Sequence, residues 1–518
     1  MLWNYSTFSK SLKPNKKPPL LFPSNPILTR LPQATFLILS LFFWFYFFTQ
    51  TASIPPIWPD EVLFFSPAQA FAKTGHLTTN VLEGLVPGME YKTLWMPPGF
   101  LILSSLFLKI LPDTIYSFRF FSALTVFLSA WLFYKLLVRE KFSKFTAMIG
   151  FATILSEPLV FRFGTSGRME GLTALFFLTS IYVAGSKRGN ISKSFLTGIF
   201  LSCSAMTHPF GASFGLVSLF FLVRDKDSTL QKFFFFVLGG MIPIGLWVAY
   251  IHPDWDLLTI QFGAQLIRKQ ILFGSFTALT KLKVFLFGFA FSKVRLIIII
   301  TQIFTLVLIS ISLYKKKHEL NSRLNVYWIW ILSVSFALYS SSEGWYVFHF
   351  IFPFAWGMAL LAEQKYFGRI LSLAGVSLSF VGWLQIVNIH WIQTDSTSIL
   401  NTQFQKLATV LKPHNKIYLQ TIPDPYFYLS DIYPNKKFLE FIPGELEFPS
   451  NEYTLVIESQ DAFVFYNDSL KNQAISLFLS SHPEWIREEW DIPVPSNHWL
   501  HFKTIVYHKP TGNEHASP

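Results

Sequence analysis

Long apolar runs separated by short polar segments dominate the first 390 residues. An α-helix needs about 20 mostly apolar residues to cross the hydrocarbon core of a bilayer. The pattern therefore predicts an all-α polytopic membrane region with about eleven spanning helices, at 31–49, 118–137, 145–161, 169–185, 194–207, 209–223, 233–251, 296–314, 325–341, 346–362 and 370–389. The short pair 194–207 and 209–223 is interpreted as a hairpin that turns at Thr207-His208-Pro209.

One apolar run, at 97–111, is too short to fit this pattern. Fifteen helical residues cover about 22 Å, less than the ~30 Å hydrocarbon core. Ser104, Ser105 and Lys109 fall on one helical face, so we expect an amphipathic helix that lies along the membrane interface. If this run spanned the bilayer, the four cations between 135 and 144 would be exported, against the positive-inside rule.

Basic residues set the orientation of the chain. They precede the first run without any acidic residue, which places the N-terminus in the cytoplasm. A cleaved signal peptide is the alternative, but the run is bulky and Phe-rich and its polar head is long, so we interpret it as a retained span. Half of the 42 Lys and Arg residues fall in the inferred cytoplasmic segments, and the odd number of spans leaves the C-terminus outside.

Because successive spans alternate in direction, the stretch 252–295 should lie outside, yet it is basic. Either this assignment of sides is wrong at that point, or the cations of the stretch, which include Arg268, face an anionic group outside, such as a lipid phosphate. We favour the second interpretation.

The composition changes at about residue 391. Half of the 30 acidic residues lie in 391–518, and the apolar runs shorten to strand length at 416–420, 453–458 and 502–508. Helical patterns at 400–411 and 468–480 alternate with these strands. We therefore predict two domains, a transmembrane domain over 1–390 and a small periplasmic α/β domain over 391–518.

Composition agrees with a membrane protein. The chain is 51% hydrophobic and only 14% charged, whereas soluble proteins average about 25% charged residues. A net charge of +12 could indicate nucleic-acid binding, but the cations cluster between apolar runs as membrane topology requires. The single Cys203 excludes an internal disulfide and a cysteine-based zinc site.

Ionisable residues avoid the middles of the predicted spans and gather at their outer ends. A coupled transporter would more often place carboxylates near the midplane, so this distribution favours chemistry at the outer interface. Asp60 and Glu61 follow the first span, and one of them could accept a proton from an incoming hydroxyl while the other orients the acceptor. The alternative is a pair of solvated loop acids. Arg168 and Glu170 open a span on the same side, as a site or as a membrane-end anchor.

Two histidines are further candidates. His208 at the hairpin apex could contact a phosphate, or it could cap a helix or belong to the core. His349 lies in an aromatic segment, where an interfacial aromatic-belt position is as plausible as ligand binding.

The combined layout resembles the polyprenyl-phosphate-sugar-dependent glycosyltransferases of the GT-C superfamily, which include protein O-mannosyltransferases and lipid A aminoarabinose transferases. It is carried by these features: Asp-Glu after the first span, Trp95-Met96-Pro97-Pro98-Gly99 before a short amphipathic helix, Arg119 at the second span, an Arg-x-acid motif at the fourth, and Thr207-His208-Pro209. The likeness covers about 30–390 and is sharpest over 58–225.

This resemblance implies an inverting sugar transfer at the periplasmic face of a bacterial inner membrane. The donor would be a polyprenyl-phosphate-linked sugar, and the acceptor a glycan, lipid or protein hydroxyl. Asp60 stands where the family has its presumed catalytic base, and Glu61 is its companion. Glu170 replaces the Asp of many relatives. Met96 replaces a Lys that often precedes the Pro-Pro pair, so Lys92, Arg168, His208 and Arg268 are the alternative phosphate contacts.

The resemblance implies no bound nucleotide, and the sequence predicts no metal site, although it leaves a divalent metal requirement open. Two rival functions are carried along. One is a lipid-linked glycan ligase or polymerase of the same fold. The other is a transporter or lipid flippase, which would be expected to show polar residues around a midplane cavity and an internal repeat.

Overall fold

The structure is a computed structural model of the chain. It describes residues 26–49, 57–83, 86–158, 160, 164–224, 228–273, 277, 279–280, 307, 321–341, 344–364, 366–395, 397–421, 423–440, 454–458, 477, 479–491 and 503–509.

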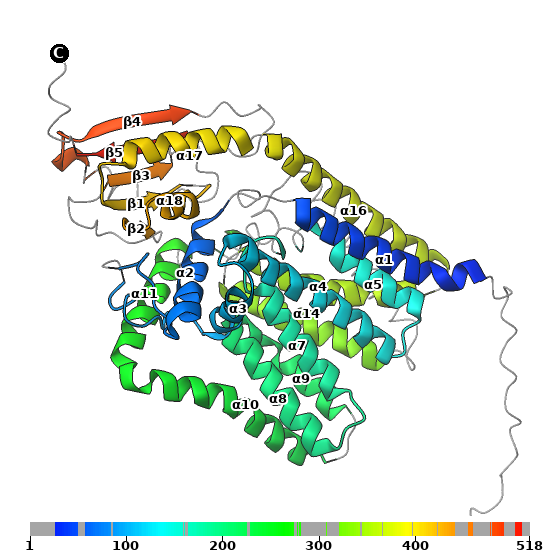
Figure 1. The fold of residues 1–518 in the computed structure, drawn as a ribbon. Helices are drawn as coiled ribbons and strands as arrows, with labels where there is room; N and C mark the ends of the chain where they lie inside the picture. The colour runs from blue at the N-terminus through cyan, green and yellow to red at the C-terminus, as the bar shows by residue number, and fades with distance from the viewer. Residues whose placement is uncertain are drawn as a thin grey trace, which may run out of the picture.

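Most of the described chain is helical (Figure 1). The α-helices of the first 395 residues are α1 (Pro26–Thr49), α2 (Pro59–Thr74), α3 (Gly99–Ile110), α4 (Ile115–Arg139), α5 (Lys144–Leu155), α7 (Glu170–Ala184), α8 (Asn190–Thr207), α9 (Gly215–Val223), α10 (Thr229–Ile251), α11 (Trp255–Phe273), α14 (Asn321–Ser341), α15 (Ile351–Ala362) and α16 (Tyr366–Asp395). Three short 3₁₀ helices connect them: η1 (Pro209–Phe214), η2 (His252–Asp254) and η3 (Gly344–Phe350).

These helices occupy most of the predicted apolar runs. Two differ in detail. Helix α5 ends at Leu155, before the predicted 161, because Pro158 disfavours the helical conformation of the residue that precedes it. The run 209–223 starts as the 3₁₀ helix η1 before it continues as α9. Apart from Val307, the predicted span 296–314 lies outside the described residues, so the number of spans stays a prediction.

The helical region has one large apolar core, built from α1, α4, α5, α7, η1, α9, α14, η3, α15 and α16. Helix α1 packs against α16 through aromatic contacts of Phe42 and Tyr46 with Trp383, each with ring centroids 6.0 Å apart. Thr114 caps α4, and its hydroxyl oxygen accepts the backbone N–H of Ser117 at 3.3 Å.

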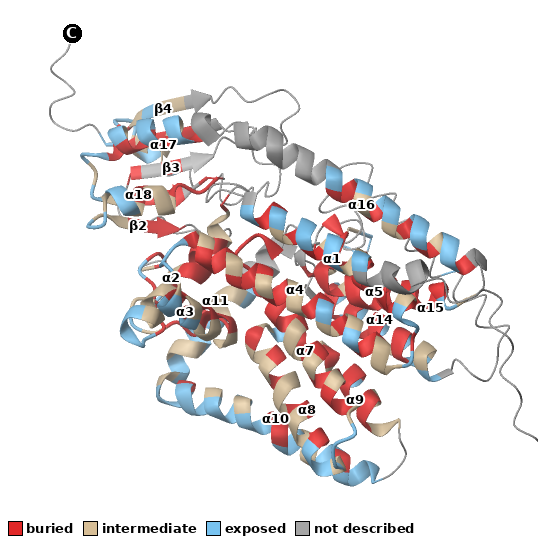
Figure 2. Ribbon diagram, turned by 45° about the vertical axis from the view of Figure 1, so that its right-hand side comes forward, coloured by how far each residue is buried: buried red, intermediate tan, exposed pale blue. Residues whose placement is uncertain are grey.

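Two helices turn large apolar side chains outward. Along α1, Leu37, Leu41 and Phe45 are 58%, 60% and 60% exposed, and α10 has a similar exposed apolar surface (Figure 2). Apolar surface of this extent is unfavourable in water and favourable in lipid. Among the described residues, α4 and the segment Thr229–Ile267 are long and apolar enough to cross a membrane.

Helices α8 and α10 approach each other closely through glycines. A Cβ atom added at Gly198 would overlap the carbonyl oxygen of Phe236, and one at Gly239 would overlap that of Phe195. Only residues without a side chain permit this backbone contact, as is common between helices in membranes.

Helix α2 occupies part of the segment expected to be a polar loop. Its start carries signals that predict a helix: Pro59 at the first position, followed by Asp60 and Glu61 in the first turn. It ends at Thr74 and is followed by Gly75, whose φ of +79° is in the left-handed region that glycine readily adopts. Helix α3 forms where the amphipathic helix was predicted, and its position relative to a membrane stays a prediction.

The C-terminal region contains a five-stranded mixed sheet with the order β2-β1-β3-β5-β4. Strand β1 pairs in parallel with β2 and β3, whereas β5 pairs antiparallel with β3 and β4. The elements are α17 (Thr397–Leu411), β1 (Lys416–Gln420), α18 (Tyr426–Ile432), β2 (Lys437–Glu440), β3 (Thr454–Glu458), β4 (Ile486–Asp491) and β5 (Lys503–His508). The three predicted strands and the helix at 400–411 are present, and most of 468–480 lies outside the described residues.

The sheet region packs on α2 and the segment that follows it (Figure 1). The backbone N–H of Asp424 donates to the carbonyl of Ile57 at 2.9 Å, and that of Glu440 donates to Val81 at 2.7 Å. Main-chain hydrogen bonds therefore join the C-terminal region to both ends of the α2 segment.

Candidate active site

The first turn of α2 brings the paired acids Asp60 and Glu61 to the centre of a charged cluster. Pro59 fixes the backbone at the helix start, and the Glu61 carboxylate accepts the N–H of Trp58 at 3.4 Å. Successive helical residues point about 100° apart, so the two carboxylates face different neighbours.

Glu61 is completely buried and forms a bidentate ion pair. Arg119 of α4 donates from Nε to Oε2 and from Nη2 to Oε1, both at 2.8 Å. The backbone N–H of Gly167 also donates to Oε2 at 2.8 Å. A side chain at Gly167 would collide with the ring of Phe118, so this backbone donor depends on glycine. Glu61 therefore joins α2, α4 and the segment before α7.

Arg168 joins the other acid to the start of α7. Its Nη1 donates to Oδ2 of Asp60 at 2.9 Å, while Nε and Nη2 donate to Oε1 of Glu170 at 3.0 and 2.8 Å. Ser122 of α4 fixes the backbone, since its hydroxyl is 3.0 Å from the N–H of Arg168 and 2.9 Å from its carbonyl oxygen. The structure thus brings Asp60, Arg168 and Glu170 together.

The carboxylates of this cluster differ in their exposure. The side chains of Glu61 and Glu170 are 0% and 1% exposed, whereas that of Asp60 is 39% exposed. Arg168 holds Oδ2 of Asp60, and no described residue donates a hydrogen bond to Oδ1. Asp60 is therefore the member of the cluster that an incoming hydroxyl can reach.

His208 occupies the turn between α8 and η1, as predicted. Its Nδ1 accepts the backbone N–H of Phe210 at 3.1 Å, which leaves the proton of the neutral ring on Nε2. This nitrogen lies 3.1 Å from the hydroxyl of Tyr346 in η3. Tyr346 is also close enough to interact electrostatically with Arg168, so His208 is connected to the cluster through Tyr346.

His349 is completely buried in an aromatic cluster. Its ring stacks on Phe210 with centroids 4.5 Å apart, and Phe214 and Phe348 contact it edge-on. Among the described residues, none hydrogen-bonds to either ring nitrogen. His349 therefore packs among aromatic rings in the protein interior and is not part of the charged cluster.

The structure places Lys92 away from this cluster, and it does not test Arg268. Lys92 pairs with Asp254 at 2.6 Å and donates to the carbonyl of Tyr250 at 2.8 Å, which ties the first loop to the end of α10. Arg268 lies in α11, and its side chain is outside the described part of the chain. Within that part, no group of three or more His, Cys, Asp and Glu side chains is arranged to hold a metal ion.

Sequence reasoning noted Arg119 only as a cation at the outer end of a span and did not pair it with Glu61. It missed two further contributors to the site. Gly167 and Tyr346 gave no comparable signal, because a backbone N–H and one tyrosine among many leave no mark in the pattern.

Comparisons with known proteins gave a family match and similar solved structures. Residues 96–251 match the family of dolichyl-phosphate-mannose-protein mannosyltransferases. No curated protein sequence matches the chain. The fold is similar to that of ArnT from Cupriavidus metallidurans bound to undecaprenyl phosphate, with a TM-score of 0.51, 11% identity, and coverage of 94% of this chain and 100% of ArnT. ArnT from Cupriavidus metallidurans in the apo state gives a TM-score of 0.42 and 12% identity, with 94% and 99% covered.

These matches agree with the resemblance seen in the sequence: the family match covers residues 96–251, and the overall fold is similar to that of ArnT. The family match includes Arg119, Arg168, Glu170 and His208, whereas Asp60 and Glu61 precede it. The roles of individual residues rest on the geometry of the cluster.

Proposed function

We propose that this protein is a membrane glycosyltransferase that moves a sugar from a polyprenyl-phosphate donor to an acceptor hydroxyl at the periplasmic face of a bacterial inner membrane. The observation that carries the proposal is the partly exposed Asp60 carboxylate held by Arg168, in a fold similar to that of ArnT bound to undecaprenyl phosphate.

Asp60 acts as the general base in this mechanism. The acceptor oxygen attacks the anomeric carbon as its proton passes to Oδ1 of Asp60, which no described donor occupies. The bond between the anomeric carbon and the phosphate oxygen breaks, polyprenyl phosphate leaves, and the configuration inverts. Arg168 and Glu170 position the carboxylate, and Glu61 positions the helix that carries it.

The leaving phosphate needs hydrogen-bond donors and positive charge rather than a strong general acid. Asp60, Arg168 and Glu170 together carry one net negative charge, and Glu61 and Arg119 neutralise each other. We therefore assign the donor phosphate to the His208–Tyr346 pair, and we keep the cations of the basic 268–295 stretch as further candidates from the sequence alone.

Two experiments test the function. Mass profiles of envelope glycans and lipids should differ by one sugar unit between cells with and without the protein. Purified protein in lipid vesicles should release polyprenyl phosphate from a polyprenyl-phosphate sugar only when the acceptor is present. Identical mass profiles together with no release of polyprenyl phosphate would contradict the proposal.

A further inference from the structure

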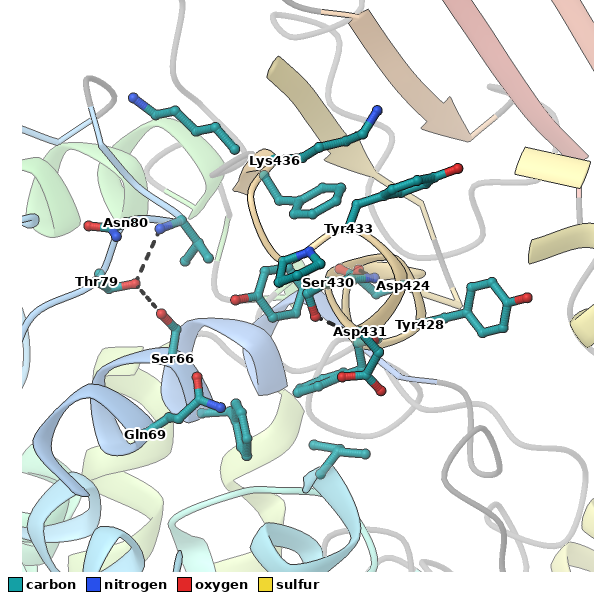
Figure 3. Close-up of a pocket in the computed structure, with 18 of the residues that line it drawn as sticks. Ser66, Gln69, Thr79, Asn80, Asp424, Tyr428, Ser430, Asp431, Tyr433 and Lys436 are labelled. Atoms are coloured by element: carbon teal, nitrogen blue, oxygen red, sulfur yellow. Dashed lines mark hydrogen bonds between the residues drawn. The ribbon is translucent and has the colours of Figure 1, made fainter. Parts of the chain in front are cut away.

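A cavity of about 870 Å³ lies between α2, the segment 78–83 and helix α18 of the C-terminal region (Figure 3). Its volume is within the range of about 300–1,000 Å³ that is typical of small-molecule sites. Ser66 and Gln69 of α2 line one side, and Asp424, Tyr428 and Ser430 line the other.

This cavity is distinct from the charged cluster around Asp60. Gln69 follows Asp60 by nine residues, which is two and a half helical turns, so the two side chains leave α2 on opposite sides. Nine residues also separate them by about 13 Å along the helix axis. A ligand in the cavity therefore does not contact the Asp60 carboxylate through the same surface of α2.

The charges that line the cavity are largely compensated. Lys73 pairs with Asp113 at 2.8 Å, and Lys437 pairs with Glu83 at 2.6 Å. Lys436 donates to the carbonyl oxygens of Leu411, Lys412 and His414, at 2.7, 2.6 and 2.7 Å. A phosphate or polyanionic ligand would require cations that are not already engaged, so the cavity favours a neutral ligand.

Asp424 supplies a buried acceptor to the cavity wall. Its side chain is completely buried, and Oδ1 accepts the backbone N–H of Tyr426 at 2.8 Å. The carboxyl of Glu440 hydrogen-bonds to that of Asp424, and no amide or hydroxyl group among the described residues donates to Oδ2. A carboxyl oxygen has two lone pairs, so this pair keeps acceptor capacity that a ligand hydroxyl can use.

Aromatic rings complete the lining. Tyr426, Phe427, Tyr428 and Tyr433 come from α18 and its end, and each ring is half-buried. Half-buried aromatic rings offer apolar faces, while hydroxyl, amide and carboxyl groups beside them offer hydrogen bonds. A sugar ring presents both C–H faces and hydroxyl groups.

We infer that this cavity binds a neutral oligosaccharide. Because the inference rests on the proposed function for its biological meaning, the oligosaccharide would be the glycan part of the acceptor, held on the C-terminal region while another part reaches Asp60. The binding itself does not require transfer, so it can be measured separately.

The test uses the full-length protein in lipid nanodiscs. The probes are three neutral tetrasaccharides (maltotetraose, mannotetraose and chitotetraose), with tetragalacturonate and inorganic phosphate as anionic probes. The pocket variant Asn80→Ala/Asp431→Ala removes two exposed polar side chains of the lining. The matched control Asn415→Ala/Asp256→Ala removes the same two residue types from exposed positions that do not line the cavity.

We expect at least one neutral tetrasaccharide to bind, with affinity reduced about tenfold or more in the pocket variant and unchanged in the control. The variant Asp60→Asn should bind it as the unaltered protein does, so loss of transfer and loss of glycan binding are distinguishable. The inference is overturned if no neutral probe binds, if an anionic probe binds in preference, or if the pocket variant binds normally.

Discussion

Arg168 Nη1 lies 2.9 Å from Oδ2 of Asp60, although 108 positions separate the two residues in the chain. The same guanidinium binds Glu170 through its other nitrogen atoms. Arg168 thus binds the partly exposed Asp60 through Nη1, and it binds the buried Glu170 through the edge formed by Nε and Nη2. A planar guanidinium can serve both partners at once, which the point charge of lysine cannot do.

Glu61 and Arg119 form a buried ion pair between α2 and α4, and removing Glu61 should destabilise the protein. Glu61→Ala leaves the Arg119 guanidinium without its bidentate partner, at a cost of about 3–5 kcal/mol in the free energy of unfolding. Lys73→Ala, which breaks the exposed pair with Asp113, should cost at most about 1 kcal/mol. Unfolding titrations in mixed micelles measure the change in unfolding free energy for both variants, and equal changes would contradict a stabilising role of the buried pair.

Alanine substitutions at two glycines, one inside the close contact of α8 with α10 and one outside it, should change the stability of the protein in opposite directions. Gly198→Ala places a methyl group against the Phe236 carbonyl and should cost about 1–3 kcal/mol. Gly245→Ala in α10 meets no atom within 4 Å, so its better helix propensity should stabilise the protein by about 0.5–1 kcal/mol. Thermal unfolding in detergent compares them; stabilisation by Gly198→Ala would show that the helices separate readily.

The orientation in the membrane can be tested by cysteine labelling. In a Cys203→Ser chain, Lys141→Cys lies between α4 and α5 on the predicted cytoplasmic side, and its side chain is exposed. An impermeant maleimide should modify it only after the membrane is opened. Tyr91→Cys, at a 77% exposed residue of the predicted outer loop, should react in intact cells. Labelling of both cysteines in intact cells would mean that α3 spans the membrane, whereas the reverse pattern would mean that the whole helical region has the opposite orientation.

Asp424 and Glu440 are buried where the C-terminal region contacts the α2 segment, and this burial should make the stability of the protein depend on pH. Burial raises the pKa of Asp424 from 3.8 to about 7, and it also raises the pKa of Glu440. Between these limits the folded protein binds protons that the unfolded chain releases, so stability falls as pH rises from about 4 to about 7.

The thermal unfolding midpoint should therefore be higher at about pH 5 than at about pH 7.5, once the general pH response is subtracted. Asp424→Asn cannot titrate and should reduce this difference, whereas Asp256→Asn on the surface should preserve it. A full difference in Asp424→Asn would exclude Asp424 as its source.

Much of the fold follows from the hydrophobic pattern. Run length locates the predicted spans because lipid tolerates few other solutions, and apolar runs of strand length locate β1, β3 and β5. Helix α2 was missed because its apolar residues face the protein and the C-terminal region rather than lipid, although Pro59 and the two acids mark its start. Strands β2 and β4 carry charged residues and lack the apolar run that reveals a strand.

The candidate site was predictable in part. The paired acids and the Arg-x-acid motif indicated residues that the structure brings into contact, since charges at span ends are costly unless they have partners. Their division of roles was not predictable. Glu61 and Asp60 are adjacent and chemically similar. Only the three-dimensional position of Arg119 places Glu61 in a buried ion pair and leaves Asp60 accessible.

The rate of sugar transfer by Asp60→Asn tests the central claim most directly. Asn keeps the shape of the side chain and one acceptor oxygen, but it cannot take the acceptor's proton. We predict a loss of about 10²–10⁴-fold in kcat with folding and donor binding nearly unchanged, while the matched control Asp256→Asn transfers at the normal rate. If Asp60→Asn retains more than about a tenth of the normal rate, Asp60 is not the general base.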